Sequence, residues 1–153
     1  MANTYTQLFI HIVFTVQGRN NLIAEKHREE LERYIVGMTL VRNHKPLAIF
    51  CMPDHLHFLV GINPNQSLSD LVRDIKSSSS NFINNNSWMP GKFSWQEGYG
   101  AFSYSKSQVK NVITYIRNQP DHHQKNTFHD EYIKLLELFD IEYNPKYLFD
   151  WVD

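Results

Sequence analysis

The chain has 153 residues, of which 42% are hydrophobic and 14% aromatic, so it is long and apolar enough to fold as one domain over residues 1–153. Its single cysteine, Cys51, excludes an intramolecular disulfide and a zinc site built from several cysteines. The net charge of −1 argues against a general nucleic-acid binder, but residues 1–120 hold 12 Lys and Arg against 8 Asp and Glu. The larger part of the chain can therefore present a local basic surface.

No segment has the pattern of a targeting or membrane-spanning element. The N-terminus lacks a basic stretch followed by an apolar core, and no apolar run approaches the ~20 residues that cross a bilayer. A single cysteine also fits a reducing compartment. We therefore expect a cytoplasmic protein without a membrane partner.

The first half of the chain alternates between strand and helix patterns. Residues 5–16 are rich in β-branched and aromatic residues, which is typical of a strand, and residues 24–41 have the apolar spacing of a helix. Residues 47–51 and 55–62 predict two strands joined by a turn at Pro53-Asp54. Ser67 is a suitable N-cap for a helix that extends to about Ile83.

The second half predicts short strands over residues 93–95 and 101–104, a helix over 105–119 and a last helix over about 129–139. The order β-α-β-β-α-β, followed by a further strand and two helices, predicts an α+β fold. Its expected form is a ferredoxin-like, RRM-like split βαβ antiparallel sheet with C-terminal helices. We expect the first two helices to cover one face of the sheet and to leave the other available for a site.

Two histidines on the second strand of the predicted hairpin mark that available face. Side chains alternate along a strand, so His55 and His57 point the same way, whereas Leu56 and Phe58 point into a core. Two imidazoles held side by side on a strand suit a divalent metal, provided that a third ligand arrives from elsewhere.

The predicted helix over residues 105–119 supplies that ligand. Tyr115 and Gln119 are four residues apart and share one face of the helix. The carbonyl oxygen of Gln119 can bind a hard cation, and Tyr115 can attack a metal-polarised phosphate to form a covalent phosphotyrosine. Pro120 leaves two geometries open: the helix ends at Asn118 and Gln119 turns away, or Pro120 opens the next helical segment.

These residues belong to four blocks that together resemble a known family. The blocks are HIVF at 11–14, MPDHLH at 52–57, WQEGYGAFS at 95–103 and YIRNQPDHH at 115–123. In this order they are similar to the HUH superfamily of single-strand endonucleases, in which U is a hydrophobic residue. The resemblance is closest to the single-tyrosine transposases of bacterial insertion sequences and their repeat-associated relatives.

The resemblance implies a metal-dependent DNA transposase with Tyr115 as nucleophile, forming a 5′-phosphotyrosine link and freeing a 3′-hydroxyl. His55, His57 and Gln119 would bind Mg²⁺ or Mn²⁺. Substrates would be single-stranded DNA ends with imperfect hairpins, and no nucleotide cofactor is expected because the phosphotyrosine stores the bond energy. The family works as a homodimer whose tyrosine helix completes the partner's histidine site, although action within one subunit stays open for this chain.

Further side chains are candidates for contacts with DNA. The basic candidates for phosphate contacts are Arg73, Lys76, Lys106, Lys110 and Arg117. The aromatic candidates for stacking on unpaired bases, of which we expect one or two to act, are Trp88, Trp95, Tyr99, Phe102 and Tyr104. We interpret His11 as a hydrogen-bonded structural residue, and we favour surface or capping roles for His122 and His123. His122 could instead accompany Gln119 near the metal, and the sequence leaves open whether any of the three histidines joins the site.

Two alternative functions remain open from the sequence. One is a non-catalytic or domesticated protein that binds hairpin DNA, and the other is a replication- or conjugation-type nickase with the same chemistry. The short chain, without a helicase or relaxase extension, disfavours the nickase. The hairpin sequence, the cleavage site and the physiological metal are not determined by these patterns.

Overall fold

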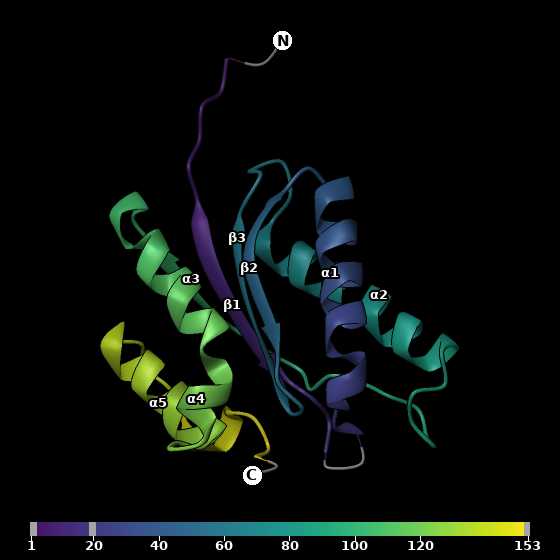
Figure 1. The fold of residues 1–153 in the computed structure, drawn as a ribbon. Coiled ribbons are helices and arrows are strands. Elements are labelled where there is room, and N and C mark those ends of the chain that lie inside the picture. Colours follow the sequence, from purple (N-terminus) through teal and green to yellow (C-terminus); the bar gives the residue numbers. More distant parts are fainter. Residues whose placement is uncertain (1–2, 19–20, 152–153) are drawn as a thin grey trace.

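The computed structural model describes residues 3–18 and 21–151, which form a four-stranded sheet with helices on both faces (Figure 1). The strands are β1 (Phe9–Thr15), β2 (Lys45–Cys51), β3 (His55–Gly61) and β4 (Gly100–Tyr104), in the spatial order β2-β3-β1-β4. All neighbouring strands are antiparallel. This is the split βαβ arrangement, and the predicted α+β fold class is confirmed.

The helices fall into two groups, one on each face of the sheet (Figure 1). The first group is α1 (Arg28–Val41), which links β1 to β2, and α2 (Leu68–Asn85), which links β3 to β4. The second group follows β4 and consists of α3 (Val109–Arg117), α4 (Gln119–His123) and α5 (Phe128–Leu138). The face expected to be available for a site is thus covered by the helices that carry the candidate nucleophile. Among the described residues, no helix is long and apolar enough to cross a lipid bilayer.

Three predicted elements differ from the structure. The first strand begins at Phe9 rather than at residue 5, and the predicted strand over 93–95 supplies only an isolated bridge between Val16 and Trp95. The predicted helix over 105–119 is split, because α3 ends at Arg117 and α4 begins at Gln119. Proline lacks an N–H and its ring clashes with the carbonyl four residues earlier, so Pro120 interrupts a continuous helix and is accommodated in a new first turn.

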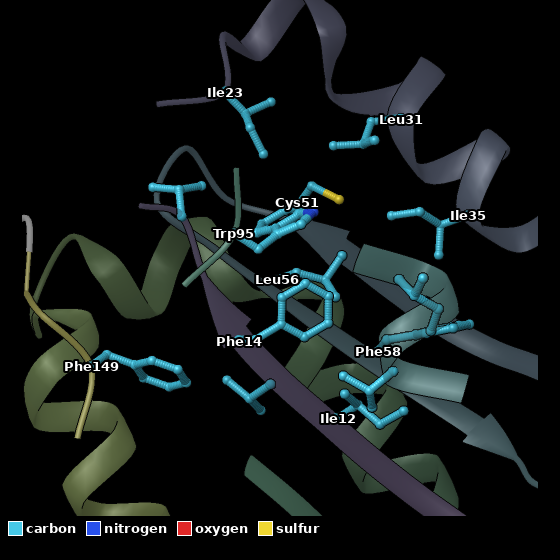
Figure 2. Packing of buried hydrophobic residues seen from close by; sticks show 14 of the residues in the cluster. Ile12, Phe14, Ile23, Leu31, Ile35, Cys51, Leu56, Phe58, Trp95 and Phe149 are labelled. Atoms are coloured by element: carbon cyan, nitrogen blue, oxygen red, sulfur yellow. The ribbon is translucent and has the colours of Figure 1, made fainter. Parts of the chain in front are cut away.

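The main hydrophobic core lies between the sheet and the helices α1 and α2. Leu56 and Phe58 of β3 are fully buried there, and Figure 2 shows Leu31 and Ile35 of α1 facing them. Cys51 is buried at the edge of the same core, as expected of a small apolar side chain. Ser67 caps α2 as predicted, because its side chain accepts a hydrogen bond from the Asp70 amide.

The position of α5 is set by a tight contact with β4 and by aromatic packing. A Cβ atom on Gly100 would lie 2.8 Å from the ring of Tyr132 on α5, so this approach requires glycine. Tyr132 also packs against Phe149 in the C-terminal segment, at 5.0 Å between ring centroids. Gln96 fixes that segment through hydrogen bonds of 2.7 and 2.8 Å with the backbone of Asp150. Together these contacts fix which residues of α5 face the sheet.

Candidate active site

The predicted histidine pair lies on the face of β3 that α3, α4 and α5 cover. His55 and His57 are both fully buried. The strand register places Thr15 of β1 opposite His55 and Val13 opposite His57. The imidazole of His55 also stacks on Phe128 of α5, with 4.0 Å between ring centroids. The strand from one side and a helix from the other therefore fix the orientation of the pair.

Each of these two imidazoles is held through its Nδ1 atom. Asp54 Oδ1 lies 2.7 Å from His55 Nδ1, and His11 Nε2 lies 2.8 Å from His57 Nδ1. Burial lowers the pKa of His57 and lowers that of His11 well below its ordinary value, so both rings are neutral. A neutral imidazole has one N–H, so His57 either donates from Nε2 to Glu131 or, with its proton on Nδ1, presents the Nε2 lone pair that binds a metal. The predicted structural role of His11 is thus a hydrogen bond to His57.

The centre of the site is a carboxylate that we did not predict. Glu131 of α5 is only 6% exposed. Its Oε1 lies 2.9 Å from His57 Nε2 and 3.1 Å from His123 Nε2. Its Oε2 accepts hydrogen bonds from the Tyr115 hydroxyl and, at 2.9 Å, from Gln119 Nε2. One carboxylate therefore connects the candidate nucleophile to the candidate metal ligands.

The charges of the site are set by Glu131 and its neighbours. Burial alone would raise the pKa of Glu131, but the adjacent His57 and His123 outweigh it and hold the pKa well below its usual range. Burial would lower the pKa of His123, but its hydrogen bond to Glu131 and the carboxylate charge raise it. Burial and the charge of Glu131 raise the pKa of Tyr115 well above its ordinary value. In the metal-free site Glu131 therefore favours the protonated forms of both His123 and Tyr115.

Gln119 reaches the site even though the helix is interrupted before it. Asn118 leaves helical geometry, with φ −93° and ψ 18°, and α4 starts anew with Pro120 in its first turn. Gln119 is nevertheless fully buried, and its Oε1 lies 3.3 Å from His55 Nε2. Of the two geometries left open by the sequence, the structure adopts the one in which Pro120 opens the next segment.

The two histidines of α4 have different surroundings. His123 Nε2 lies 2.9 Å from Gln119 Oε1, so of the two roles left open for His123 the structure adopts the one within the site and not the favoured surface or capping role. It follows Gln119 by four residues and shares its face of α4. His122 lies against the ring of Tyr115, with 4.6 Å between ring centroids.

The sequence does contain a signal for Glu131. Phe128, Glu131, Tyr132 and Leu135 follow the i, i+3, i+4, i+7 spacing of the buried face of an amphipathic helix, and all four are buried. A carboxylate is rarely fully buried unless it has a partner. A glutamate at a core position of the last predicted helix therefore indicates a polar partner on the opposing surface.

The converging donor atoms fit a divalent metal. One ligand atom from each of His55, His57, His123 and Glu131 lies within 4.8 Å of all the others. Gln119 adds an amide oxygen beside His55, at 3.3 Å from Nε2. Carboxylate and amide oxygens suit Mg²⁺ and Mn²⁺, and an imidazole supplies a nitrogen ligand once its coordinating nitrogen carries no proton.

Tyr115 completes this arrangement within a single chain. Its ring lies 5.9 Å from that of His57, measured between centroids, and its hydroxyl is hydrogen-bonded to Glu131. Of the residues predicted for the site, Tyr115, His55, His57 and Gln119 are thus all brought together. Mutual contact of a tyrosine, two imidazoles and an amide in one buried site is suited to metal-assisted nucleophilic attack on a phosphate.

The basic candidates for DNA contacts do not gather at this site. Arg73 and Lys76 lie on α2, on the opposite side of the sheet, where Arg73 pairs with Asp70 at 3.0 Å. The Lys76 ammonium donates to the carbonyls of Gln96 and Gly98 at 2.7 and 2.6 Å, and burial lowers its pKa to about 8. The remaining three are exposed on α3 or the turn before it and are Lys106, Lys110 and Arg117.

The aromatic candidates are divided between core and surface. Trp95 and Phe102 are buried, and the Trp95 indole donates to Ser79 Oγ at 2.9 Å. Trp88 stacks on His27 at 4.1 Å between centroids. Tyr99 is 36% exposed and Tyr104 half-buried, so these two are the more accessible of the set.

Comparison with known proteins places these features in context. Residues 4–119 match the family model described as IS200-like transposase. The chain is similar to the ISDra2 transposase TnpA of Deinococcus radiodurans, with 22% identity over 122 residues that cover 75% of this chain and 86% of that protein. The family match ends at Gln119, so His123 and Glu131 lie beyond it.

Two solved structures share the fold. One is a candidate transposase from Deinococcus radiodurans R1, with a TM-score of 0.60 and 20% identity, covering 78% of this chain and 95% of that one. The other is the REP-associated tyrosine transposase bound to a REP hairpin, with a TM-score of 0.61 and 15% identity, covering 100% of this chain and 93% of that one. The second likeness extends over the C-terminal helices as well as the sheet.

Proposed function

The chain belongs to the IS200-like transposase family and is a transposase enzyme, and from this premise we propose that residues 1–153 act as one domain that cleaves and rejoins single-stranded DNA at hairpin-bearing ends. The observation that carries the proposal is the contact of the Tyr115 hydroxyl with a buried carboxylate that also touches His57. The REP-associated transposase of the same fold is bound to a REP hairpin, which supports a hairpin substrate.

The proposed cofactor is Mg²⁺ or Mn²⁺, held by His55, His57 and Gln119 with Glu131 as an added ligand. Support comes from the convergence of their donor atoms and from the hydrogen bonds that hold both imidazoles at Nδ1. When bound, the ion supplies Lewis-acid polarisation of the scissile phosphate and compensates the charge that develops on it.

The proposed reaction forms one phosphoester bond and breaks another. The Tyr115 oxygen attacks phosphorus, and the bond from phosphorus to the 3′-oxygen of the preceding nucleotide breaks. The phenolic proton of Tyr115 passes to solvent, because Glu131, whose pKa is held well below its usual range, is too weak a base to take it, and the departing 3′-oxygen takes up a proton from solvent. The product is a 5′-phosphotyrosine and a free 3′-hydroxyl. Attack by another 3′-hydroxyl reverses these steps and rejoins the strands without a nucleotide cofactor.

We further propose that the enzyme is a homodimer in which each site is completed by its own tyrosine. Within one chain α3 packs on β2 and β3, and Tyr115 already lies beside His57. Exchange of the tyrosine helix between subunits would require α3 to leave its own sheet and expose the apolar side chains beneath it, of which Val112 and Ile116 are buried.

Covalent trapping tests the proposed function. The protein is incubated with a pool of labelled single-stranded hairpin DNAs and Mn²⁺ and then resolved on a denaturing gel. We expect a protein–DNA adduct that EDTA prevents and that disappears in Tyr115→Phe. Tyr147→Phe is the matched control, because Tyr147 is 83% exposed and does not line the pocket at Tyr115, and it should retain the adduct. Binding of the pool without any adduct, or an adduct that persists in Tyr115→Phe, would contradict the proposal.

A further inference from the structure

The geometry points to the groove between α3 and α5 as the binding site for the unpaired nucleoside on the 3′ side of the scissile phosphate. This inference rests on the proposed function and adds a substrate subsite to it. The groove is a cavity of about 440 Å³, within the ~300–1,000 Å³ typical of small-molecule sites. Its two long walls are formed by side chains at helical spacing, namely Gln108, Asn111, Val112, Lys134, Leu135 and Leu138.

The groove begins at the nucleophile. Tyr115 of α3 and Glu131 of α5 both line it, and His122 of α4 lies beside them. Gln108, at the far end of the α3 wall, precedes Tyr115 by seven residues, which corresponds to about 10 Å along a helix. A nucleoside joined to a phosphorus at the Tyr115 hydroxyl is therefore within reach of the groove.

The direction of attack selects the 3′ nucleoside rather than the 5′ one. Displacement at phosphorus is in line, so the departing 3′-oxygen lies opposite the attacking Tyr115 oxygen and carries its nucleoside away from α3. The 5′-oxygen that stays bonded to phosphorus points to the side of this axis. Its nucleoside, which becomes attached to Tyr115, can lie along the wall next to the tyrosine. The groove is lined by Tyr115 and by the residues of this wall.

The lining of the groove matches the chemistry of a base. Val112 and Leu135 form apolar walls that are 6% and 7% exposed, and Leu138 at the mouth is 72% exposed, which provides surface for the faces of a base. Asn111 offers an amide that can both donate to and accept from a base edge. Lys134 offers an ammonium for the next phosphate. Among the described residues, the side chains of Asn111 and Lys134 have no hydrogen-bond or ion-pair partner, so both are available to a ligand.

One wall of the groove lies outside the part of the chain that the family model matches. The match ends at Gln119, whereas Lys134, Leu135 and Leu138 belong to α5. The same helix supplies Glu131 to the site. The C-terminal extension therefore contributes both to the reacting centre and to the surface on which we place the nucleoside.

Nucleotide titration tests this subsite without requiring cleavage. Deoxyadenosine and thymidine 5′-monophosphates are titrated into the full-length protein with Mg²⁺ and followed by ¹H–¹⁵N NMR, with 2-deoxyribose 5-phosphate as the base-free probe. We expect shift changes concentrated in residues 104–115 and 126–138, and binding at least tenfold weaker for the base-free probe. Asn111→Trp, which fills the groove, should weaken nucleotide binding at least tenfold. Thr114→Trp, on an exposed position of the same helix outside the groove lining, should not.

The outcomes separate this inference from the proposed function. Equal binding of the base-free probe, shift changes elsewhere, or equal losses in the two tryptophan variants would overturn the subsite. A covalent adduct in the trapping assay without nucleotide binding in the groove would overturn the subsite and leave the transposase chemistry standing. Base-dependent binding in the groove without any adduct would support the subsite and contradict the chemistry.

Discussion

The two faces of β3 are both buried, one by apolar side chains and the other by polar ones. Leu56 and Phe58 point into a core formed with α1 and α2, where they pack against other apolar side chains (Figure 2). His55 and His57 point toward α3, α4 and α5, where every ring nitrogen has a polar neighbour. Both faces are fully buried in this strand, so burial alone does not distinguish scaffold from site.

The two faces of β3 should respond differently to substitution. Buried polar groups destabilise a protein unless they are hydrogen-bonded, and on the site face each hydrogen bond ends at another residue of the site. We therefore expect substitutions on the apolar face to change the free energy of unfolding. Substitutions on the site face should change metal affinity and reactivity more than stability.

The largest expected effect is on the apolar face. Phe58 is fully buried, and replacing a buried phenylalanine by alanine costs about 3–5 kcal/mol. Phe58→Ala should lower the free energy of unfolding by this amount in urea titrations with EDTA present. A loss below about 1 kcal/mol would show that the apolar face is not the main source of stability.

On the site face, His11→Leu should weaken Mn²⁺ binding 10–100-fold by titration calorimetry, the usual effect of losing a residue that orients a metal ligand. The physical reason is that His57 Nδ1 loses its 2.8 Å partner. Stability should change less than in Phe58→Ala, because His11 Nδ1 is buried and unpartnered among the described residues. Unchanged affinity would mean that His11 does not orient His57.

Gly100→Ala should lower both the stability of the protein and its affinity for Mn²⁺. The added Cβ would lie 2.8 Å from the Tyr132 ring, and such overpacking costs about 1–3 kcal/mol. Because Tyr132 is next to Glu131 on α5, displacement of the helix should weaken Mn²⁺ binding as well as stability. A variant that is less stable but binds Mn²⁺ as tightly as the wild type would show that the position of α5 does not affect the metal centre.

The smallest expected effect depends on pH. The folded protein raises the pKa of His123 above its unfolded value of about 6.5 through Glu131. The resulting ion pair stabilises the metal-free protein below that unfolded value, and this contribution is lost as the pH rises through the raised value. His123→Gln should therefore lower the free energy of unfolding in EDTA more at pH 6 than at pH 9, by about 1 kcal/mol or less. An equal loss of unfolding free energy at pH 6 and at pH 9 would exclude the ion pair.

The strand side of the site was predictable because it depends on local geometry. Alternation along β3 fixes His55 and His57 on one face whatever the surrounding fold. Gln119 also lies beside the histidines, although Asn118 breaks the helix that was expected to carry it next to Tyr115. Gln119 is the first residue of the short helix α4, whose orientation directs the Gln119 side chain into the site.

Glu131 was not predicted because its contacts are distant in sequence. It meets His57 across 74 positions of the chain, and only the docking of α5 on β4 brings the two together. The position of a glutamate on the apolar stripe of the last helix indicates a polar partner, but it does not say which one. The same reasoning applies to His123, whose role depends on where the interrupted helix resumes.

Mn²⁺ binding by electron paramagnetic resonance tests most directly whether the site face of β3 is a metal centre. We predict one Mn²⁺ per wild-type chain, loss of binding in the double variant His55→Ala/His57→Ala, and retention in Phe58→Leu, which changes only the apolar face of the same strand. Absence of binding to the folded wild-type protein, or equal binding by the double variant, would contradict the assignment of the two faces.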